Sequence, residues 1–99
     1  MKLKLDGITL KDVKGNEVLD DKGNIVYLKD QIANILAMDS DPARNGLKMF
    51  ELARKFASMD EIEIDKADVK LILQAVNSQH LTAILRGSIE ELLDKEDKA

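Results

Sequence analysis

The pattern of hydrophobic and polar positions divides the chain into a β-prone first third and a helical remainder. Short β-prone runs flank two copies of the turn sequence Lys-Gly-Asn, at residues 14–16 and 22–24. Glycine readily adopts the positive φ that tight hairpin turns need, and asparagine tolerates it better than most residues. We therefore predict a β-meander over residues 1–28, with its clearest hairpin within residues 17–28. The two β-prone runs on either side of Asp6-Gly7, Lys2–Leu5 and Ile8–Val13, form either one strand with a bulge at Gly7 or two separate strands.

Residues 29–94 show the three- and four-residue spacing of amphipathic helices. A short first helix is predicted from Lys29 to about Met38. The second helix is predicted to begin at Pro42, with Asp41 as its N-cap, because proline suits the first helical position. We expect this second helix to end at about residue 58.

The strict alternation of residues 61–64, Glu-Ile-Glu-Ile, predicts a short strand that joins the N-terminal sheet. Asp65 is then a suitable N-cap for a third helix over residues 66–78. A last helix is predicted over residues 81–94, because its apolar stripe continues past Gly87. A capping box at residues 88–91 would instead restart the helix there. We expect residues 95–99 to fray.

Together these elements predict one α+β domain, with a small N-terminal antiparallel β-meander or hairpin packed against three to four α-helices. The chain has 99 residues, of which 44% are hydrophobic and 34% are charged, so it can form both a core and a solvated surface. Only three residues are aromatic, Tyr27, Phe50 and Phe56. The core is therefore predicted to be aliphatic.

Candidate chemistry is sparse. The chain has no cysteine and one histidine, His80, which argues against a zinc or transition-metal cage within one chain. The Asp/Asn/Gly clusters do not fit the ligand spacing of a calcium loop, and no phosphate-binding glycine loop is present. A hydrolase would need His80 in a deep pocket beside a carboxylate. We expect no catalytic residue, no cofactor and no metal site, and predict that the protein is not an enzyme.

The charge distribution disfavours nucleic acid as a partner. The net charge is −4, and residues 60–99 hold five bases against ten acids. Nucleic-acid binders usually carry a basic patch, because neutralising phosphates dominates their affinity. No apolar run approaches the length of a membrane helix, and the first residues lack the apolar stretch of a signal peptide. We expect a soluble intracellular protein.

The second and third predicted helices are apolar over wide arcs. A helix that is apolar on two sides is either central in its own domain or half-buried in a partner. Either a monomeric core encloses all these side chains, or some of them bind a second copy or another protein. The candidate interface residues are Leu47, Phe50, Leu71, Leu81, Leu85 and Leu92.

A DNA-linked regulator is the alternative from another functional class. Residues 66–94 follow the order helix, short connector, helix that a helix-turn-helix also shows, and the acidic second half could instead mimic DNA. Against the first form, the last helix holds Arg86 but also Glu90, Glu91 and Asp94, which phosphate would repel.

The chain resembles, over about its whole length, a family of small proteins encoded in bacteriophage and prophage genomes. The similarity lies in a Gly-Asn hairpin leading into residues 24–30, a short helix ending in Leu-Ala at residues 36–37, and the helix at residues 50–56. It continues through the strand at residues 61–64, the helix at residues 69–76, and Gly87 ahead of Glu91-Leu92-Leu93. The family has no assigned catalytic residues. The resemblance implies a phage accessory or assembly protein that works by binding other proteins. It also implies a location in the cytoplasm of a bacterial host or in association with a virion.

Overall fold

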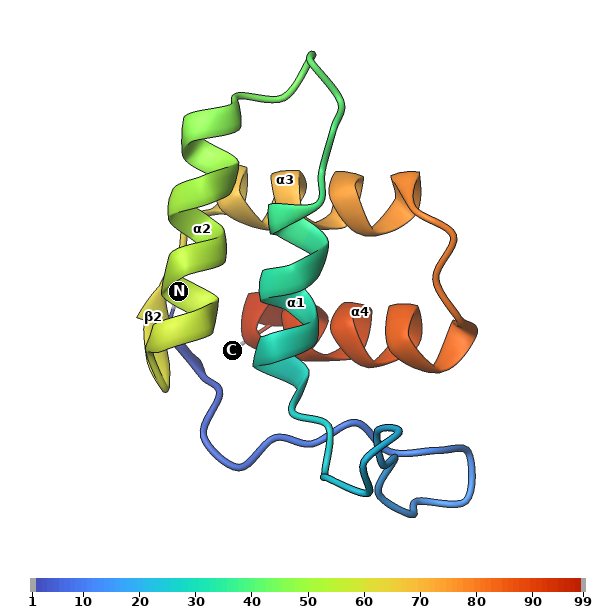
Figure 1. Cartoon of the computed structure of the whole chain (residues 1–99). Coiled ribbons are helices and arrows are strands. Elements are labelled where there is room, and N and C mark those ends of the chain that lie inside the picture. The colour runs from blue at the N-terminus through green and yellow to red at the C-terminus, as the bar shows by residue number, and fades with distance from the viewer. Residues whose placement is uncertain (1, 99) are drawn as a thin grey trace.

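Two short strands and four helices make up the regular structure of this protein (Figure 1). The computed structural model describes the backbone of residues 2–98 and the side chains of residues 2–94. The elements are β1 (Lys2–Lys4), α1 (Leu28–Ala37), α2 (Gly46–Ser58), β2 (Glu61–Glu63), α3 (Lys66–Ser78) and α4 (Ala83–Lys98). The predicted α+β class is confirmed.

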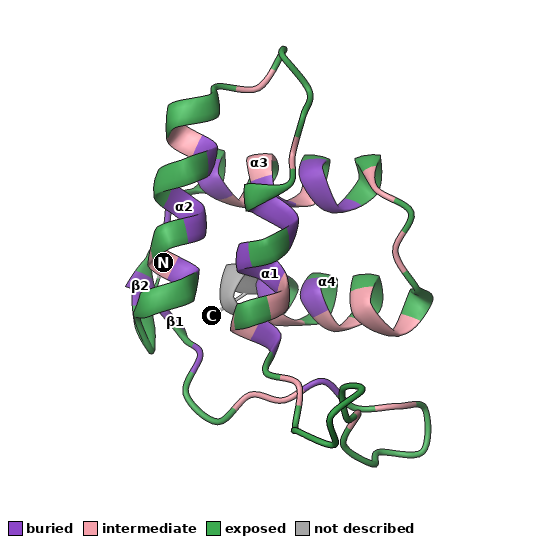
Figure 2. Ribbon diagram, in the orientation of Figure 1, coloured by how far each residue is buried: buried purple, intermediate pink, exposed green. Residues whose placement is uncertain are grey.

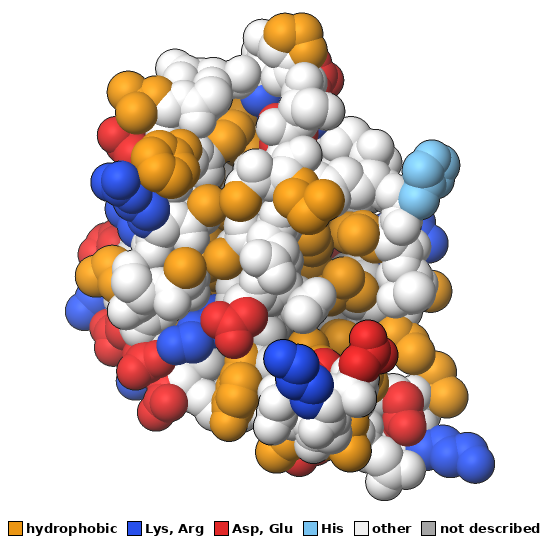
Figure 3. Space-filling model, in the orientation of Figure 1, with side chains coloured by type: hydrophobic (Ala, Val, Ile, Leu, Met, Phe, Trp, Pro, Cys, Tyr) orange, Lys and Arg blue, Asp and Glu red, His pale blue; other side chains and the backbone are white. Residues whose placement is uncertain are grey.

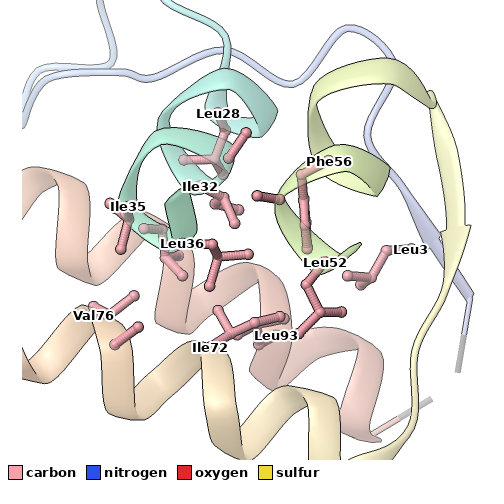
Figure 4. Packing of buried hydrophobic residues seen from close by; sticks show 14 of the residues in the cluster. Leu3, Leu28, Ile32, Ile35, Leu36, Leu52, Phe56, Ile72, Val76 and Leu93 are labelled. Carbon is pink, nitrogen blue, oxygen red and sulfur yellow. The ribbon is translucent and has the colours of Figure 1, made fainter. Parts of the chain in front are cut away.

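The helices form two layers. α1 and α2 run antiparallel in the front layer of Figure 1, and α3 and α4 run antiparallel across them behind. Buried side chains lie where the layers face each other (Figure 2). Figure 4 shows Ile32 and Leu36 from α1, Phe56 from α2, and Ile72 and Val76 from α3 pointing into this space. As predicted, this core is aliphatic apart from Phe56.

β1 and β2 form a two-stranded antiparallel sheet at one edge of the helical layers. Leu3 pairs with Ile62, and both side chains are buried while their charged neighbours are exposed. This alternation fits a sheet with one face on the core and one in solvent. The prediction that the Glu-Ile-Glu-Ile segment joins an N-terminal strand is confirmed. Gly7, with a φ of 74°, separates β1 from the residues that follow it.

Residues 8–28, which we call the turn module, do not form the three regular strands of the predicted meander. They contain three isolated antiparallel bridges, Thr9 with Tyr27, Lys11 with Glu17, and Leu19 with Ile25. The N–H of Leu10 donates to the carbonyl of Val26, that of Val26 to Val18, and that of Val18 to Leu10. The three segments thus close into a ring of hydrogen bonds. Each segment pairs with one neighbour at its first residue and with the other neighbour two residues later. No pair of segments therefore stays together long enough to form a regular β-ladder.

The two Lys-Gly-Asn turns of the module are built alike. Asp12 Oδ1 accepts the N–H groups of Lys14 and Asn16, and Asp20 Oδ1 accepts the equivalent pair in the second turn. The glycines at residues 15 and 23 have φ values of 86° and 83°. Both turns therefore have the positive-φ glycine that the sequence predicts, and aspartate side chains complete their backbone hydrogen bonding.

The predicted start of the second helix is wrong. α2 begins at Gly46, and its N-cap is Asn45, whose side chain accepts the N–H of Lys48. Asp41 instead forms a local turn by accepting the N–H of Ala43. Arg44 pairs with Asp39 and donates to Ser78 at the end of α3, and these contacts hold the residues before Gly46 in a loop.

The other helix predictions agree closely with the structure. α3 has the predicted bounds and a capping box in which Asp65 and Asp68 each accept the other's backbone N–H. α4 is continuous through Gly87, as predicted, although it begins at Ala83 and continues beyond the predicted end to Lys98. The predicted fraying of residues 95–99 falls partly outside the described residues, which end at 98.

Candidate functional site

The six predicted interface residues separate into two groups. Leu47 and Phe50, on α2, are 68% and 51% exposed. The other four are partly buried against the core, and they are Leu71, Leu81, Leu85 and Leu92. Of the predicted interface residues, Leu47 and Phe50 are therefore the two that another protein could contact most fully.

Leu47 and Phe50 belong to a longer row on the outer side of α2. Leu47, Phe50, Arg54 and Ala57 follow one another at intervals of three, four and three residues, and all four are exposed. We call this row the α2 seam. The spacing is that of the contact positions of a coiled coil, which bring successive side chains onto one line along a helix. The seam is therefore a continuous strip for contact with another helix.

Tertiary contacts hold α2 in place beneath the seam. Met49, Leu52 and Phe56 are buried and fix the opposite side of the helix on the core. Lys48 Nζ lies 3.0 Å from Asp68 Oδ1, which ties α2 to the first turn of α3. The seam is consequently presented on a fixed scaffold, and a partner would not have to order it on binding.

Arg54 and Phe50 interact within the seam. The guanidinium carbon of Arg54 lies 4.3 Å from the centre of the Phe50 ring, a cation–π contact. Within the described residues Arg54 forms no ion pair with a carboxylate. The seam thus combines an apolar end with a cation that can still pair with an acidic group.

The surface around the seam is also apolar in part. The end of α1 and the first half of α2 lie at the same end of the molecule (Figure 1), and Met38, next to α1, is 74% exposed. Figure 3 shows hydrophobic side chains spread over the α1 and α2 face, with acidic and basic groups along its left and lower edges. This face therefore suits a partner with an apolar centre.

Asp39 and Arg44 form a buried ion pair that the sequence analysis did not identify. Arg44 Nη2 lies 2.6 Å from Asp39 Oδ1, Nε donates to both carboxylate oxygens, and Nη2 also donates to Ser78 at the end of α3. The hydrogen bonds from Arg44 hold the pKa of Asp39 below its ordinary value. This pair joins the loop after α1 to α3. The two partners are five positions apart in an irregular loop, which no periodic pattern marks.

Asp68 is the other buried carboxylate with a structural role. Burial alone would raise its pKa, but the backbone N–H of Asp65 and the ammonium group of Lys48 outweigh that effect and lower it. The same contact raises the pKa of Lys48. Both groups therefore stay charged at neutral pH.

His80 lies exposed in the connector between α3 and α4. The hollow around it, about 440 Å³, is lined by Asn77, Gln79, Leu81, Thr82 and Arg86 besides the histidine, and none of these carries a carboxylate. The arrangement that the hydrolase hypothesis required does not occur there.

The helix-turn-helix alternative concerns α3 and α4. These two helices run antiparallel, whereas a helix-turn-helix places its helices at about 90–120°.

The turn module carries a second exposed apolar surface. Leu19 and Ile25 are bridge partners, and the hydrogen bonds on either side of them make them a non-hydrogen-bonded pair, in which side chains lie closest. Tyr27 follows two residues later, and all three are exposed. The β-prone runs indicated strands here but did not show which side chains would face solvent.

No helix in residues 2–98 has the combination of length and hydrophobicity needed to cross a membrane. Searches found no protein-family model, curated protein or solved structure that matches this chain.

Proposed function

We propose that this protein is a non-enzymatic binding protein that contacts another protein chain through the α2 seam. The observation that carries the proposal is the exposure of Leu47 and Phe50, side by side on a helix whose other side is fixed in the core. Large apolar side chains grouped on a fixed surface are typical of protein-binding sites, where aromatic and arginine residues supply much of the binding energy.

The proposed setting is phage assembly or the takeover of a bacterial host. The resemblance to small phage and prophage proteins supports it. The protein would act in the host cytoplasm or in the virion. The partner would contribute an apolar strip, with an acidic group placed to meet Arg54.

Affinity capture tests this proposal. The immobilised full chain is exposed to lysates of bacteria and of phage-infected bacteria, alongside a Leu47→Glu/Phe50→Glu double variant. The control is Val13→Glu, which adds a charge at a more exposed apolar position in the turn module. We expect at least one protein to be retained by the wild type and the control and lost by the double variant. Retention that is equal for all three proteins would contradict the proposal.

A parallel measurement addresses the DNA-linked alternative. Titration of duplex DNA at several salt concentrations would give a binding constant that falls steeply with salt if phosphates were contacted. We expect no such salt-dependent binding, because residues 60–99 are strongly acidic. Salt-sensitive DNA binding that Arg86→Ala weakens would favour the regulator instead.

A further inference from the structure

We propose that the chain that occupies the α2 seam is a second copy of this protein, packed antiparallel against the first about a two-fold axis level with residue 52. This inference rests on the proposed function, since it names the partner of the same surface. It follows from the order of side chains along the seam.

The α2 seam is complementary to a second copy of itself that runs in the opposite direction. A two-fold axis level with residue 52 places residue 47 of one copy opposite residue 57 of the second, and residue 50 opposite residue 54. Leu47 then faces Ala57, a large side chain against a small one. Phe50 faces Arg54, the same pair of groups that forms a cation–π contact within one chain. Both matches are made twice, as a two-fold interface requires.

Charge complementarity supports the same register. Glu51 is exposed and lies next to the seam on α2. In the antiparallel arrangement Glu51 of one copy lies diagonally beside Arg54 of the second, so the cation gains the carboxylate that it lacks within the described chain. The parallel arrangement would instead place Arg54 against Arg54, and like charges at a contact position are destabilising.

The size of the seam sets the strength of the complex. Specific interfaces bury at least about 1,200 Å² of total surface, and two helices as short as α2 bury an area near or below that limit. We therefore expect a dimer that dissociates on dilution and whose energy is concentrated in Leu47, Phe50 and Arg54.

Light scattering or sedimentation equilibrium on the full chain gives the first test. From about micromolar to about millimolar concentration, the wild type should pass from one chain to two. Phe50→Lys should weaken the dimer at least about tenfold, because it places a lysine against Arg54 at both symmetry-related contacts. Val13→Lys, which adds the same charge in the turn module, should dimerise like the wild type. A wild type that stays monomeric throughout, or a Phe50→Lys variant that dimerises equally well, would overturn the inference.

A charge exchange tests the register. Arg54→Glu alone creates a Glu–Glu contact across the axis, and Glu51→Arg alone creates an Arg–Arg contact, so each variant should be weaker as a homodimer than the wild type. An equal mixture restores both opposite-charge contacts and should form a mixed dimer. Since all the changed positions are exposed, circular dichroism should show unchanged helix content. A mixture that associates no better than its components would overturn the antiparallel register.

The capture experiment separates the two levels of the argument. If the wild type is monomeric and still retains a partner through Leu47 and Phe50, the self-pairing is wrong and the proposed function stands. If it is monomeric and capture does not depend on these residues, both are wrong.

Discussion

The turn module and the helical core are stabilised in different ways, although the same chain of 99 residues forms both. Residues 8–28 are held by aspartate side chains on nearby backbone N–H groups and by one ring of backbone hydrogen bonds. Most of this segment is exposed (Figure 2), and the residues that it contributes to the buried cluster are Leu10 and, at the start of α1, Leu28. The helical layers bury aliphatic side chains from segments far apart in the sequence. Local chemistry therefore defines the first region, and long-range packing defines the second.

The largest expected difference between the two regions is in the response to lost side-chain volume. Ile72→Ala removes methylenes from a fully buried site and should lower the free energy of unfolding by about 2–5 kcal/mol. Val18→Ala, at a partly buried site of the turn module, should cost only about 1 kcal/mol. Urea denaturation followed by circular dichroism measures both. Equal losses would show that the module is an integral part of the core.

Breaking the Asp39–Arg44 pair should have the next largest effect. Asp39→Asn leaves the geometry of the loop nearly unchanged but removes the charge that Arg44 binds. We expect a loss of about 1–3 kcal/mol, since hydrogen bonds to a buried charged group become poorly satisfied. The control is Glu61→Gln, whose pairing with Lys2 is exposed and should contribute little. If the two variants are equally stable, the pair does not anchor the loop.

Acid should weaken the helical core through Asp39 and Asp68. Both carboxyls have a pKa below the ordinary 3.8 in the folded protein, so near that pH the folded state binds fewer protons than the unfolded state. Their contribution to the free energy of unfolding is therefore complete above 3.8 and is lost as pH falls toward the lower folded-state values. Urea denaturation at successive pH values should show a shallower acid loss for Asp39→Asn than for the wild type. Parallel curves would contradict this role for Asp39.

The smallest expected effects concern two glycines and have opposite signs. Gly23→Ala forces a side chain onto a φ of 83° and should destabilise the turn module by about 1 kcal/mol. Gly87 lies within α4 with open space around it, so Gly87→Ala should raise the free energy of unfolding by about 0.5–1 kcal/mol. Thermal denaturation should show a lower Tm for Gly23→Ala and a higher Tm for Gly87→Ala than for the wild type. If both variants changed the Tm in the same direction, the difference in backbone conformation between the turn and the helix would not explain the effect of alanine at these sites.

Much of the candidate surface could be predicted from residue spacing, but its exposure could not. The apolar width of α2 indicated that Leu47 and Phe50 were candidates for an interface. The same reasoning selected Leu71, Leu81, Leu85 and Leu92, which are partly buried against the core. Helical periodicity shows on which face of a helix an apolar side chain lies, but not what packs against that face. The sequence pattern is therefore the same for a side chain in the protein's own core and for one that contacts a partner.

The sequence by itself determined the local features of this protein. These are the two turns with their positive-φ glycines, the alternating strand at residues 61–64, the capped α3 and the continuous α4, each depending on residues within one or two turns of one another. Only the tertiary structure decided that the three segments of the turn module close into a ring, that α2 starts at Gly46, and that Asp39 binds Arg44. These features depend on contacts between separate segments, such as that of Arg44 with Ser78 as well as with Asp39, and the free energy of such contacts is set by burial and geometry that no local pattern contains.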